Sequence, residues 1–291
     1  MQVFETPGSV SLQIKLPSGR VVVTTADEPR TTVEVVALGR RGQDAIDEID
    51  VTMDERHGRH VVRIEQKDKF RWGPIQITWG GDFECRITCP PGTDLDLAGG
   101  STDLRAEGEL GEVSVRSASG DIRLGSVTGD LRAHTGAGDI RVGSVTGSLF
   151  AETSGGDIRV EDVGGAASAE TAGGDIVLAA VAGSVQAETG GGDVRVGIVS
   201  RAIKGGIAIR NSGGDVTLTL PSDFKGDVEL IVIGSPGFNE DLIRSDFAEV
   251  SLTRRPDSQK AVGALNGGGP KVVVRTTSGA IRLRKGPAAE R

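Results

Sequence analysis

The sequence Gly138-Asp139-Ile140-Arg141-Val142 decides the fold of this chain, because near copies of it recur at a fixed spacing. Together with 138–142, the segments at residues 120–124, 156–160, 174–178 and 192–196 form a series in which each begins 18 residues after the one before. A fixed period of this length is typical of a solenoid, in which each repeat forms one turn and buries its apolar side against its neighbours. The sequence therefore predicts a stack of similar turns.

Each 18-residue repeat contains two strand-like segments, of which 138–142 is the first and 147–153 the second. Apolar and polar residues alternate in both, which is the pattern of strands with one buried face. We therefore expect Ile140 and Ala151 to point inward and Phe150 to point outward, with glycine-rich corners between the strands. The predicted fold class is all-β: a single-stranded parallel β-solenoid (β-helix) with 18-residue turns, right-handed by analogy with other solenoids.

Residues 1–98 do not follow the repeat and are predicted to form an N-terminal antiparallel β layer that caps the solenoid. Ser9–Leu16 is predicted to pair with Arg20–Thr25, and Ile49–Met53 with Val61–Glu65. Such a cap is required because a bare terminal turn would expose an unpaired sheet edge.

The rest of the chain is predicted to have three parts. Regular repeats fill residues 99–221, with a four-residue insertion at 201–204 that lengthens one step to 22 residues. Residues 222–285 are predicted to be an irregular excursion followed by a closing solenoid turn, since the sequence at 278–283 resembles the repeat. Residues 286–291 are predicted to be a disordered tail.

Composition and charge exclude several kinds of partner. The net charge is −8 with acidic and basic residues interleaved, which argues against nucleic acid and against a basic membrane-binding patch. No apolar run is long enough for a transmembrane helix, and residues 1–5 do not resemble the start of a secretory signal. Cys85 and Cys89, four positions apart on one predicted strand, are too distant for a disulfide and are expected to be reduced. We therefore expect a cytoplasmic protein, with peripheral association with the cell envelope as an open alternative.

Aromatic residues gather in one short segment. Among seven Phe and two Trp, four lie within 14 positions: Phe70, Trp72, Trp79 and Phe83. One interpretation is an exposed loop that binds a partner or touches a membrane. The other is a loop that folds back and plugs the end of the solenoid, since large side chains are scarce in this chain.

Outward residues of successive turns are predicted to stack in columns. The aspartate column from Asp103 to Asp193 is interpreted as structural, neutralised by an arginine column two positions along. Calcium is the alternative, but the Gly-Gly-x-Gly-x-Asp phrase of calcium-binding β-rolls does not match. A row of hydroxyl residues from Ser117 to Thr189 is predicted to be a structural ladder at a corner.

A second outward row is predicted to carry three glutamates between basic residues: Arg116, His134, Glu152, Glu170, Glu188 and Arg210. It is interpreted either as a solvated acidic stripe or as a set of oxygen ligands for a divalent ion. His57 and His60 flank a turn and have no partners at a metal-binding spacing. Nucleophile-elbow, P-loop and dinucleotide-binding motifs are absent from the sequence. We expect no catalytic residue, no metal ligand and no cofactor, and hence not an enzyme.

Several segments together resemble a known family. They are the Ser-Gly-Asp-Ile repeats, the strand at 85–91 with its Pro-Pro-Gly-Thr ending, the Leu220-Pro221 step, and Thr277-Ser278-Gly279-Ala280-Ile281. These resemble the "toastrack" family of bacterial β-strand-repeat domains of unknown function, also called the "putative adhesin" family. The resemblance implies a β-solenoid with no known enzymatic activity, in a family often found at the membrane or near cell-envelope stress systems. The repeats are also similar in type to those of bactofilins, which polymerise end to end.

The predicted function is a non-enzymatic interaction scaffold that self-associates or binds another protein, with a link to cell-envelope stress. The alternative is an adhesin-like module that binds a glycan or a divalent metal. A carbohydrate-active enzyme is a weaker alternative, because such enzymes need an aromatic-lined groove and the repeats carry few aromatic residues. The candidate interaction surface consists of Phe70, Trp72, Trp79, Phe83, Glu152, Glu170 and Glu188.

Overall fold

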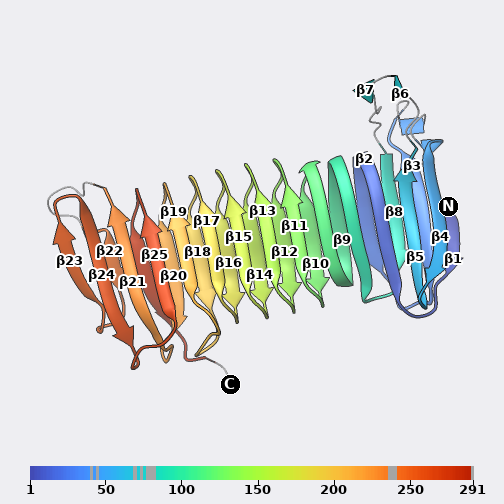
Figure 1. Cartoon of the computed structure of the whole chain (residues 1–291). Coiled ribbons are helices and arrows are strands. Elements are labelled where there is room, and N and C mark those ends of the chain that lie inside the picture. Colours follow the sequence, from blue (N-terminus) through green and yellow to red (C-terminus); the bar gives the residue numbers. More distant parts are fainter. Residues whose placement is uncertain are drawn as a thin grey trace. The chain divides into compact units, whose positions relative to one another are not determined.

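The computed structural model describes residues 1–39, 42–43, 46–67, 71–72, 75–76, 83–234 and 241–289. Strands, turns and loops account for nearly all of them, and Gly42, Gln43 and Ile46 are helical. The chain divides into two compact units, Met1–Gly143 and Ser144–Arg291, whose strands can be followed by colour in Figure 1. The predicted all-β solenoid class is confirmed.

The first unit contains strands β1 to β12. They are β1 (Gln2–Glu5), β2 (Val10–Thr25), β3 (Arg30–Ala37), β4 (Ile49–Arg56), β5 (Arg59–Gln66), β6 (Arg71–Trp72), β7 (Ile75–Gln76), β8 (Phe83–Cys89), β9 (Thr93–Ser119), β10 (Ile122–Val127), β11 (Leu131–Thr135) and β12 (Ile140–Val145), which ends just past the unit boundary.

Two long strands form solenoid turns in the first unit. β2 and β9 each bend at a corner, so the two halves of each strand contribute to different sheets. Ser11–Leu16 and Ser18–Thr24 of β2 pair in parallel with consecutive stretches of β9. β10 and β11 then pair in parallel with β9, at the 18-residue step that the repeat predicts (Leu104 opposite Ile122).

The predicted pairing of Ser9–Leu16 with Arg20–Thr25 is wrong. Residues 10–15 pair in parallel with β5, and residues 20–25 pair in parallel with β8. The corner at Gly19 turns the strand from one sheet into the next instead of reversing it. Gly19 has a φ of +108°, and a Cβ at this position would lie 3.0 Å from the ring of Phe83. The corner therefore needs glycine both for its backbone angle and for space.

Antiparallel strands end the sheets of the first unit on its N-terminal side. β3 pairs with β8, β1 pairs with β3, and β4 pairs with β5. The predicted pairing of Ile49–Met53 with Val61–Glu65 is confirmed, with Val51 opposite Ile64. The predicted boundary between residues 98 and 99 falls inside β9, which crosses it without a break.

The second unit contains strands β13 to β26. They are β13 (Leu149–Thr153), β14 (Ile158–Val163), β15 (Ala167–Thr171), β16 (Ile176–Val181), β17 (Val185–Thr189), β18 (Val194–Ile198), β19 (Ile207–Asn211), β20 (Val216–Pro221), β21 (Gly226–Ile233), β22 (Ile243–Ser245), β23 (Ser251–Arg255), β24 (Ser258–Leu265), β25 (Lys271–Thr276) and β26 (Ile281–Gly286).

Alternate strands of the repeats form two sheets in the second unit. β13, β15, β17 and β19 pair in parallel in one sheet, and β14, β16, β18 and β20 pair in parallel in the other. The insertion at 201–204 leaves this pairing intact, because Val185 of β17 still lies opposite Ile207 of β19. Ile203 of the insertion is itself buried.

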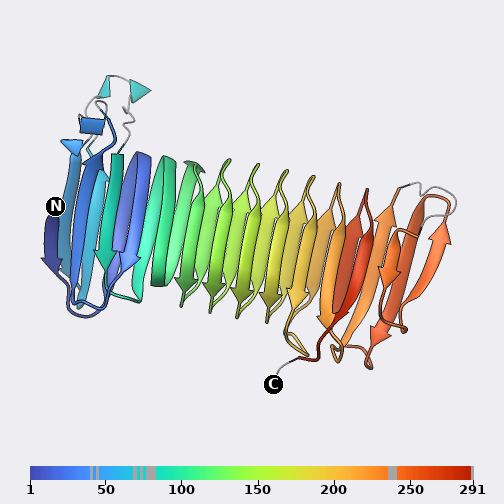
Figure 2. The same cartoon turned by 180° about the vertical axis from the view of Figure 1, so that it is seen from behind.

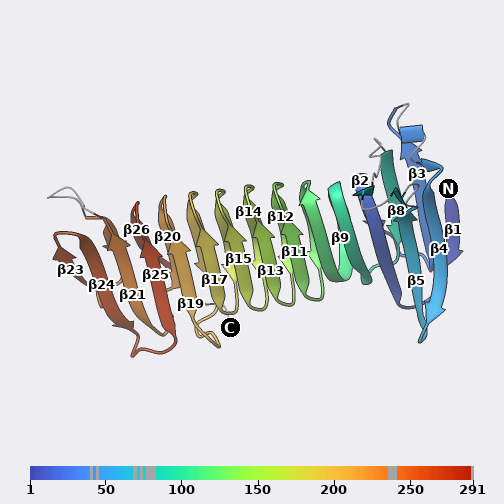
Figure 3. The ribbon, with the colours of Figure 1, turned by 45° about the horizontal axis from the view of Figure 1, so that its top comes forward.

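The closing turn of the second unit, formed by β25 and β26, is followed in the stack by strands that precede it in the sequence. β25 pairs with β19, and β26 pairs with β20, as the repeat-like sequence predicts. The preceding segment stacks on the far side of this turn: β21 on β25 and β22 on β26 in parallel, then β24 and β23 in antiparallel order (Figures 2 and 3). The predicted irregular excursion therefore contains four strands.

The predicted disordered tail is partly ordered. Gly286 ends β26. Ser222 donates its backbone N–H to the carbonyl of Pro287 at 3.3 Å, and the N–H of Ala289 donates to Asp223 Oδ1 at 3.1 Å. These bonds fix residues 287–289 beside the loop after β20, and residues 290–291 lie outside the described range.

Hydroxyl side chains at the corners bind backbone groups of neighbouring turns. The Thr189 hydroxyl donates to the carbonyl of Gly174, one turn earlier, at 2.8 Å and accepts the N–H of Gly192 at 3.3 Å. Thr135 and Thr171 make the same two bonds in their own turns. The predicted hydroxyl ladder is confirmed, and it satisfies corner groups that the sheets leave unpaired.

The repeat aspartates form a second ladder. Asp175 Oδ1 accepts the backbone N–H of Asp193, one turn later, at 2.8 Å. Asp193 Oδ2 accepts from Arg195, two positions along, at 2.7 Å. The preceding glycine permits this close stacking, because a Cβ on Gly192 would lie 2.2 Å from the carbonyl oxygen of Gly174. The aspartate column is therefore structural, as predicted.

Asp215 ends the aspartate ladder of the second unit. Ala280 occupies the equivalent place in the next turn, and its N–H donates to Asp215 Oδ1 at 2.9 Å while Arg282 donates to Oδ2 at 2.6 Å. The bond from the Ala280 N–H, followed by that from Arg282, holds the pKa of Asp215 below its ordinary value. A lowered folded-state pKa stabilises the fold above the unfolded-state pKa of about 3.9, and this contribution is lost as the pH falls through the folded-state pKa.

We expect Asp215→Ala to lower the free energy of unfolding at pH 7 by about 1–2 kcal/mol, because two donors lose their acceptor at a partly exposed site. Asp215→Asn keeps an oxygen acceptor and should lower the free energy of unfolding by a smaller amount. Urea unfolding from about pH 5 to pH 2 measures both variants, and their deficits should shrink as wild-type Asp215 becomes protonated. Deficits that stay constant over this range would contradict the assigned role of the carboxylate.

The two cysteines lie on the inner side of β8, four positions apart, and are free. Both are 0% exposed. Burial raises the pKa of the Cys85 thiol to about 12 and that of Cys89 to about 11, where the Thr93 hydroxyl offsets part of the effect. Both thiols are therefore protonated at neutral pH.

We expect neither thiol of the native protein to react with a thiol-specific chromogenic reagent at about pH 8, because the thiolate is the reactive form. In denaturant both should react at once. Rapid labelling of either cysteine under native conditions would contradict the burial of β8.

Candidate functional site

The aromatic part of the predicted interaction surface lies largely outside the described residues. Phe70 and Trp79 are among the undescribed ones, and only the backbone of Trp72, in β6, is described. Phe83 is 0% exposed. It alternates with solvent-facing residues on β8 and points to the same inner side as Cys85. Phe83 therefore belongs to the core, and its assignment to an interaction surface is corrected.

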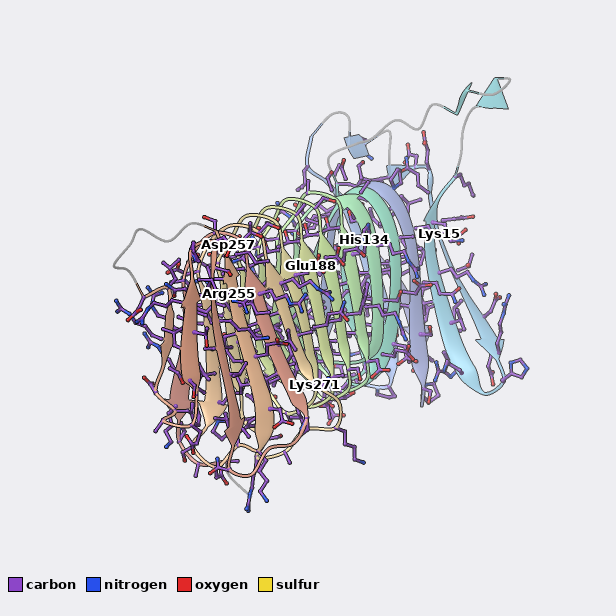
Figure 4. The ribbon with its side chains drawn as sticks, turned by 60° about the vertical axis from the view of Figure 1, so that its left-hand side comes forward. Lys15, His134, Glu188, Arg255, Asp257 and Lys271 are labelled. Carbon is purple, nitrogen blue, oxygen red and sulfur yellow. The ribbon has the colours of Figure 1, made fainter. Side chains whose placement is uncertain are left out.

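The glutamate row lies on the outer side of one sheet of the second unit. Glu152, Glu170 and Glu188 occupy equivalent positions of β13, β15 and β17 and lie directly opposite one another. They point outward because the residues on either side of each, such as Ala151 and Thr153, are buried. We name the outward residues of β13, β15, β17, β19, β25, β21 and β24 the Glu–Arg face. Figure 4 shows Glu188 and Lys271 on it.

The Glu–Arg face is acidic in one half and basic in the other. Arg210 of β19 and Arg275 of β25 continue the row that the three glutamates begin. Arg210 donates to Glu188 at 3.5 Å where the two halves meet. The basic half also carries Lys271 and Lys260.

The pKa of Glu229 reports the positive potential of the basic half. Lys260 of β24 pairs with Glu229 of β21 at 2.5 Å. This bond, with further attraction from Arg275 and Lys271, holds the pKa of Glu229 below its ordinary value. A free anion approaching this half would be attracted by the same cations.

An uncharged row runs beside the charged one. It consists of Phe150, Ser168, Gln186, Ala208 and Val273, which lie opposite one another along the register. Phe150 is 44% exposed. Because the other side chains are mostly small, the surface beside them is hollowed by about 490 Å³, lined in part by Gln186, Ala208 and Val273. A second hollow of about 300 Å³ borders the three glutamates.

Metal-binding geometry is not assembled in the part of the chain that the structure describes. Within that part, no group of three or more His, Cys, Asp or Glu is arranged to hold a metal ion. His60 Nε2 lies 3.1 Å from the carbonyl oxygen of Pro7, and His57 sits in a turn with a φ of +53°. Among the described residues, none of the helices has the length and apolar character needed to span a membrane.

A third hollow lies on the other sheet of the second unit. It measures about 830 Å³ and is lined mainly by apolar side chains such as Val177 and Val199, with residues 286–289 along one side. Its lining includes Arg195, which is paired with Asp193. The hollow therefore has an apolar wall and a neutralised cation.

Arg275 is the functional residue that the sequence interpretation missed. The row predicted from the repeats ends at Arg210, because Arg275 comes 65 residues later in the chain. It joins the row because β25 pairs directly with β19. The signal that could have found it is the phrase Lys271–Thr276, in which Arg275 stands where the repeats place a glutamate.

We expect Phe83→Ala to lower the free energy of unfolding by about 3–5 kcal/mol, because the substitution removes a fully buried aromatic ring and leaves a cavity in the core. Phe150→Ala is the matched control on an exposed phenylalanine and should change stability by less than about 1 kcal/mol. Thermal or urea unfolding of both variants measures the difference. Equal effects at the two positions would contradict the assignment of Phe83 to the core and Phe150 to the surface.

Comparison with known proteins places the chain in a family. The family model described as Toastrack DUF4097 matches residues 6–170, which is more than half of the chain. None of the curated proteins matches this chain. A solved "putative cell adhesion protein" from Clostridium sporogenes ATCC 15579 is 10% identical, covers 98% of both chains and has a TM-score of 0.29. A solved "putative adhesin" from Bacteroides fragilis NCTC 9343 is 11% identical, covers 98% of this chain and 95% of its own, and has a TM-score of 0.36. The family resemblance of the repeats is thus confirmed, and this chain belongs to the Toastrack DUF4097 family.

Proposed function

We propose that this chain is a non-enzymatic interaction scaffold that binds protein, a second copy of itself included, through the Glu–Arg face. The observation that carries the proposal is the division of this face into an acidic and a basic half beside an uncharged row with an exposed Phe150. Charged groups of this kind select and orient a partner, while an exposed aromatic ring gives it apolar surface to bury.

The rigidity of the face supports the same function. Each of its inner strands is hydrogen-bonded on both sides, and the corners are fixed by the threonine and aspartate ladders. A surface that is already ordered loses little conformational entropy when a partner binds. The proposed link to cell-envelope stress rests on the family resemblance.

The hollow beside the glutamates favours a second candidate, an adhesin-like module that binds a glycan. Three carboxylates that border a hollow of about 300 Å³ are suitable acceptors for sugar hydroxyl groups. A divalent ion is less well supported, because these glutamates do not converge on one point within the described structure.

We expect a photo-crosslinking amino acid at Ser168, in the uncharged row of the face, to give protein adducts in cells that produce this chain. The same amino acid at Arg159, which is exposed on the opposite sheet of the unit, is the matched control and should give few. Electrophoresis and mass spectrometry of the adducts measure both. Equal adducts at the two positions, or none at Ser168, would contradict the scaffold function, and binding of the purified chain to a glycan array would favour the second candidate.

A further inference from the structure

The charges of the Glu–Arg face are complementary to the same row read backwards. From β13 to β21 the row is Glu152, Glu170, Glu188, Arg210, Arg275 and Ile231. Its four residues from β15 to β25 carry two carboxylates and then two cations, and read from β25 to β15 the two cations come first. A surface that matches its own reverse is what a two-fold symmetric dimer requires, because both subunits then contribute the same patch.

A two-fold axis parallel to the strands produces this reversal. Rotation about such an axis keeps each residue at its height along the strand and reverses the order of the strands. With the axis between β17 and β19, Glu188 faces Arg210 of the second copy, and Glu170 faces Arg275 of the second copy. We propose that the chain forms such a face-to-face dimer through the Glu–Arg face, which deepens and rests on the proposed scaffold function.

The uncharged row is compatible with the same axis near its centre. The rotation places Gln186 opposite Ala208 of the second copy and Ser168 opposite Val273 of the second copy. These side chains border the hollow of about 490 Å³, so the two sheets can approach closely there. At the edge of the contact, Phe150 of β13 lies opposite Glu229 of β21 of the second copy.

The size of the contact indicates a weak dimer. Six strands at about 4.8 Å and five residues at about 3.3 Å give a contact of roughly 29 by 16 Å, or about 900 Å² for the two copies together. Contacts of this size belong to transient associations rather than permanent ones. The charged rows on both copies also make the association dependent on ionic strength.

Sedimentation velocity of the full chain over a wide concentration range tests the dimer. Glu170→Arg and Arg275→Glu each place like charges opposite one another and should weaken association about tenfold or more. The double variant E170R/R275E places opposite charges across the axis again and should recover association to within roughly threefold of wild type. Arg159→Glu makes the same charge change on the other sheet and should leave association unchanged.

The variants separate failure of the dimer from failure of the scaffold function. If wild type associates and the single variants Glu170→Arg and Arg275→Glu associate as strongly as Arg159→Glu, the chain self-associates through a surface other than the Glu–Arg face. If the single reversals weaken association and the double variant does not restore it, the two-fold arrangement is overturned. A wild-type chain that stays monomeric at every concentration overturns the dimer, while the crosslinking at Ser168 still decides the scaffold function. Association that requires calcium and disappears with a chelator would replace the ion pairs by a metal site.

Discussion

The hydrogen bonds at the corners are the interaction on which both units depend. A strand that bends from one sheet into the next leaves backbone N–H and C=O groups without a sheet partner, and leaving them unpaired in a buried corner is costly. Thr189 and Asp193 solve this problem in one turn, since the hydroxyl bonds the glycine backbone and the carboxylate accepts the N–H of the next turn. The glycine before Asp193 contributes to the same arrangement, because a side chain at Gly192 would collide with the backbone of the preceding turn.

Fixed corners leave the outward positions of the strands free to vary. Inward positions must be apolar and of matched size, as Ala169 and Ala187 are in neighbouring turns. Outward positions carry no such restriction, so a row of glutamates can change into a row of arginines without disturbing the fold. Antiparallel strands end one or more sheets of each unit, such as β4 in the first unit and β23 in the second, and they differ from the parallel turns they cover. Function in this chain is therefore expected on the sheet faces.

Much of the fold and part of the site could be predicted from the sequence. The repeat gave the strands, their parallel pairing, the inward and outward residues, both corner ladders and the glutamate row. The assignment of Phe83 to an interaction surface is wrong. The alternation on β8 indicates that Phe83 shares a side with Cys85, but it does not indicate which side is buried. The pairing of residues 10–15 with 20–25 was wrong because a turn signal at Pro17–Gly19 fits a corner as well as a hairpin.

The sequence by itself determined the solenoid turn, because an 18-residue repeat of alternating residues and glycine corners has one way to bury its apolar rows. Only the tertiary structure decided which strand follows which where the repeat stops. β25 pairs with β19 although five strands, β20 to β24, separate them in the sequence, and this pairing places Arg275 in the row with Glu188. Pairing between distant segments depends on which sheet edge is open when they meet, and local sequence patterns do not encode that choice. The charge-divided face therefore exists only in the folded chain.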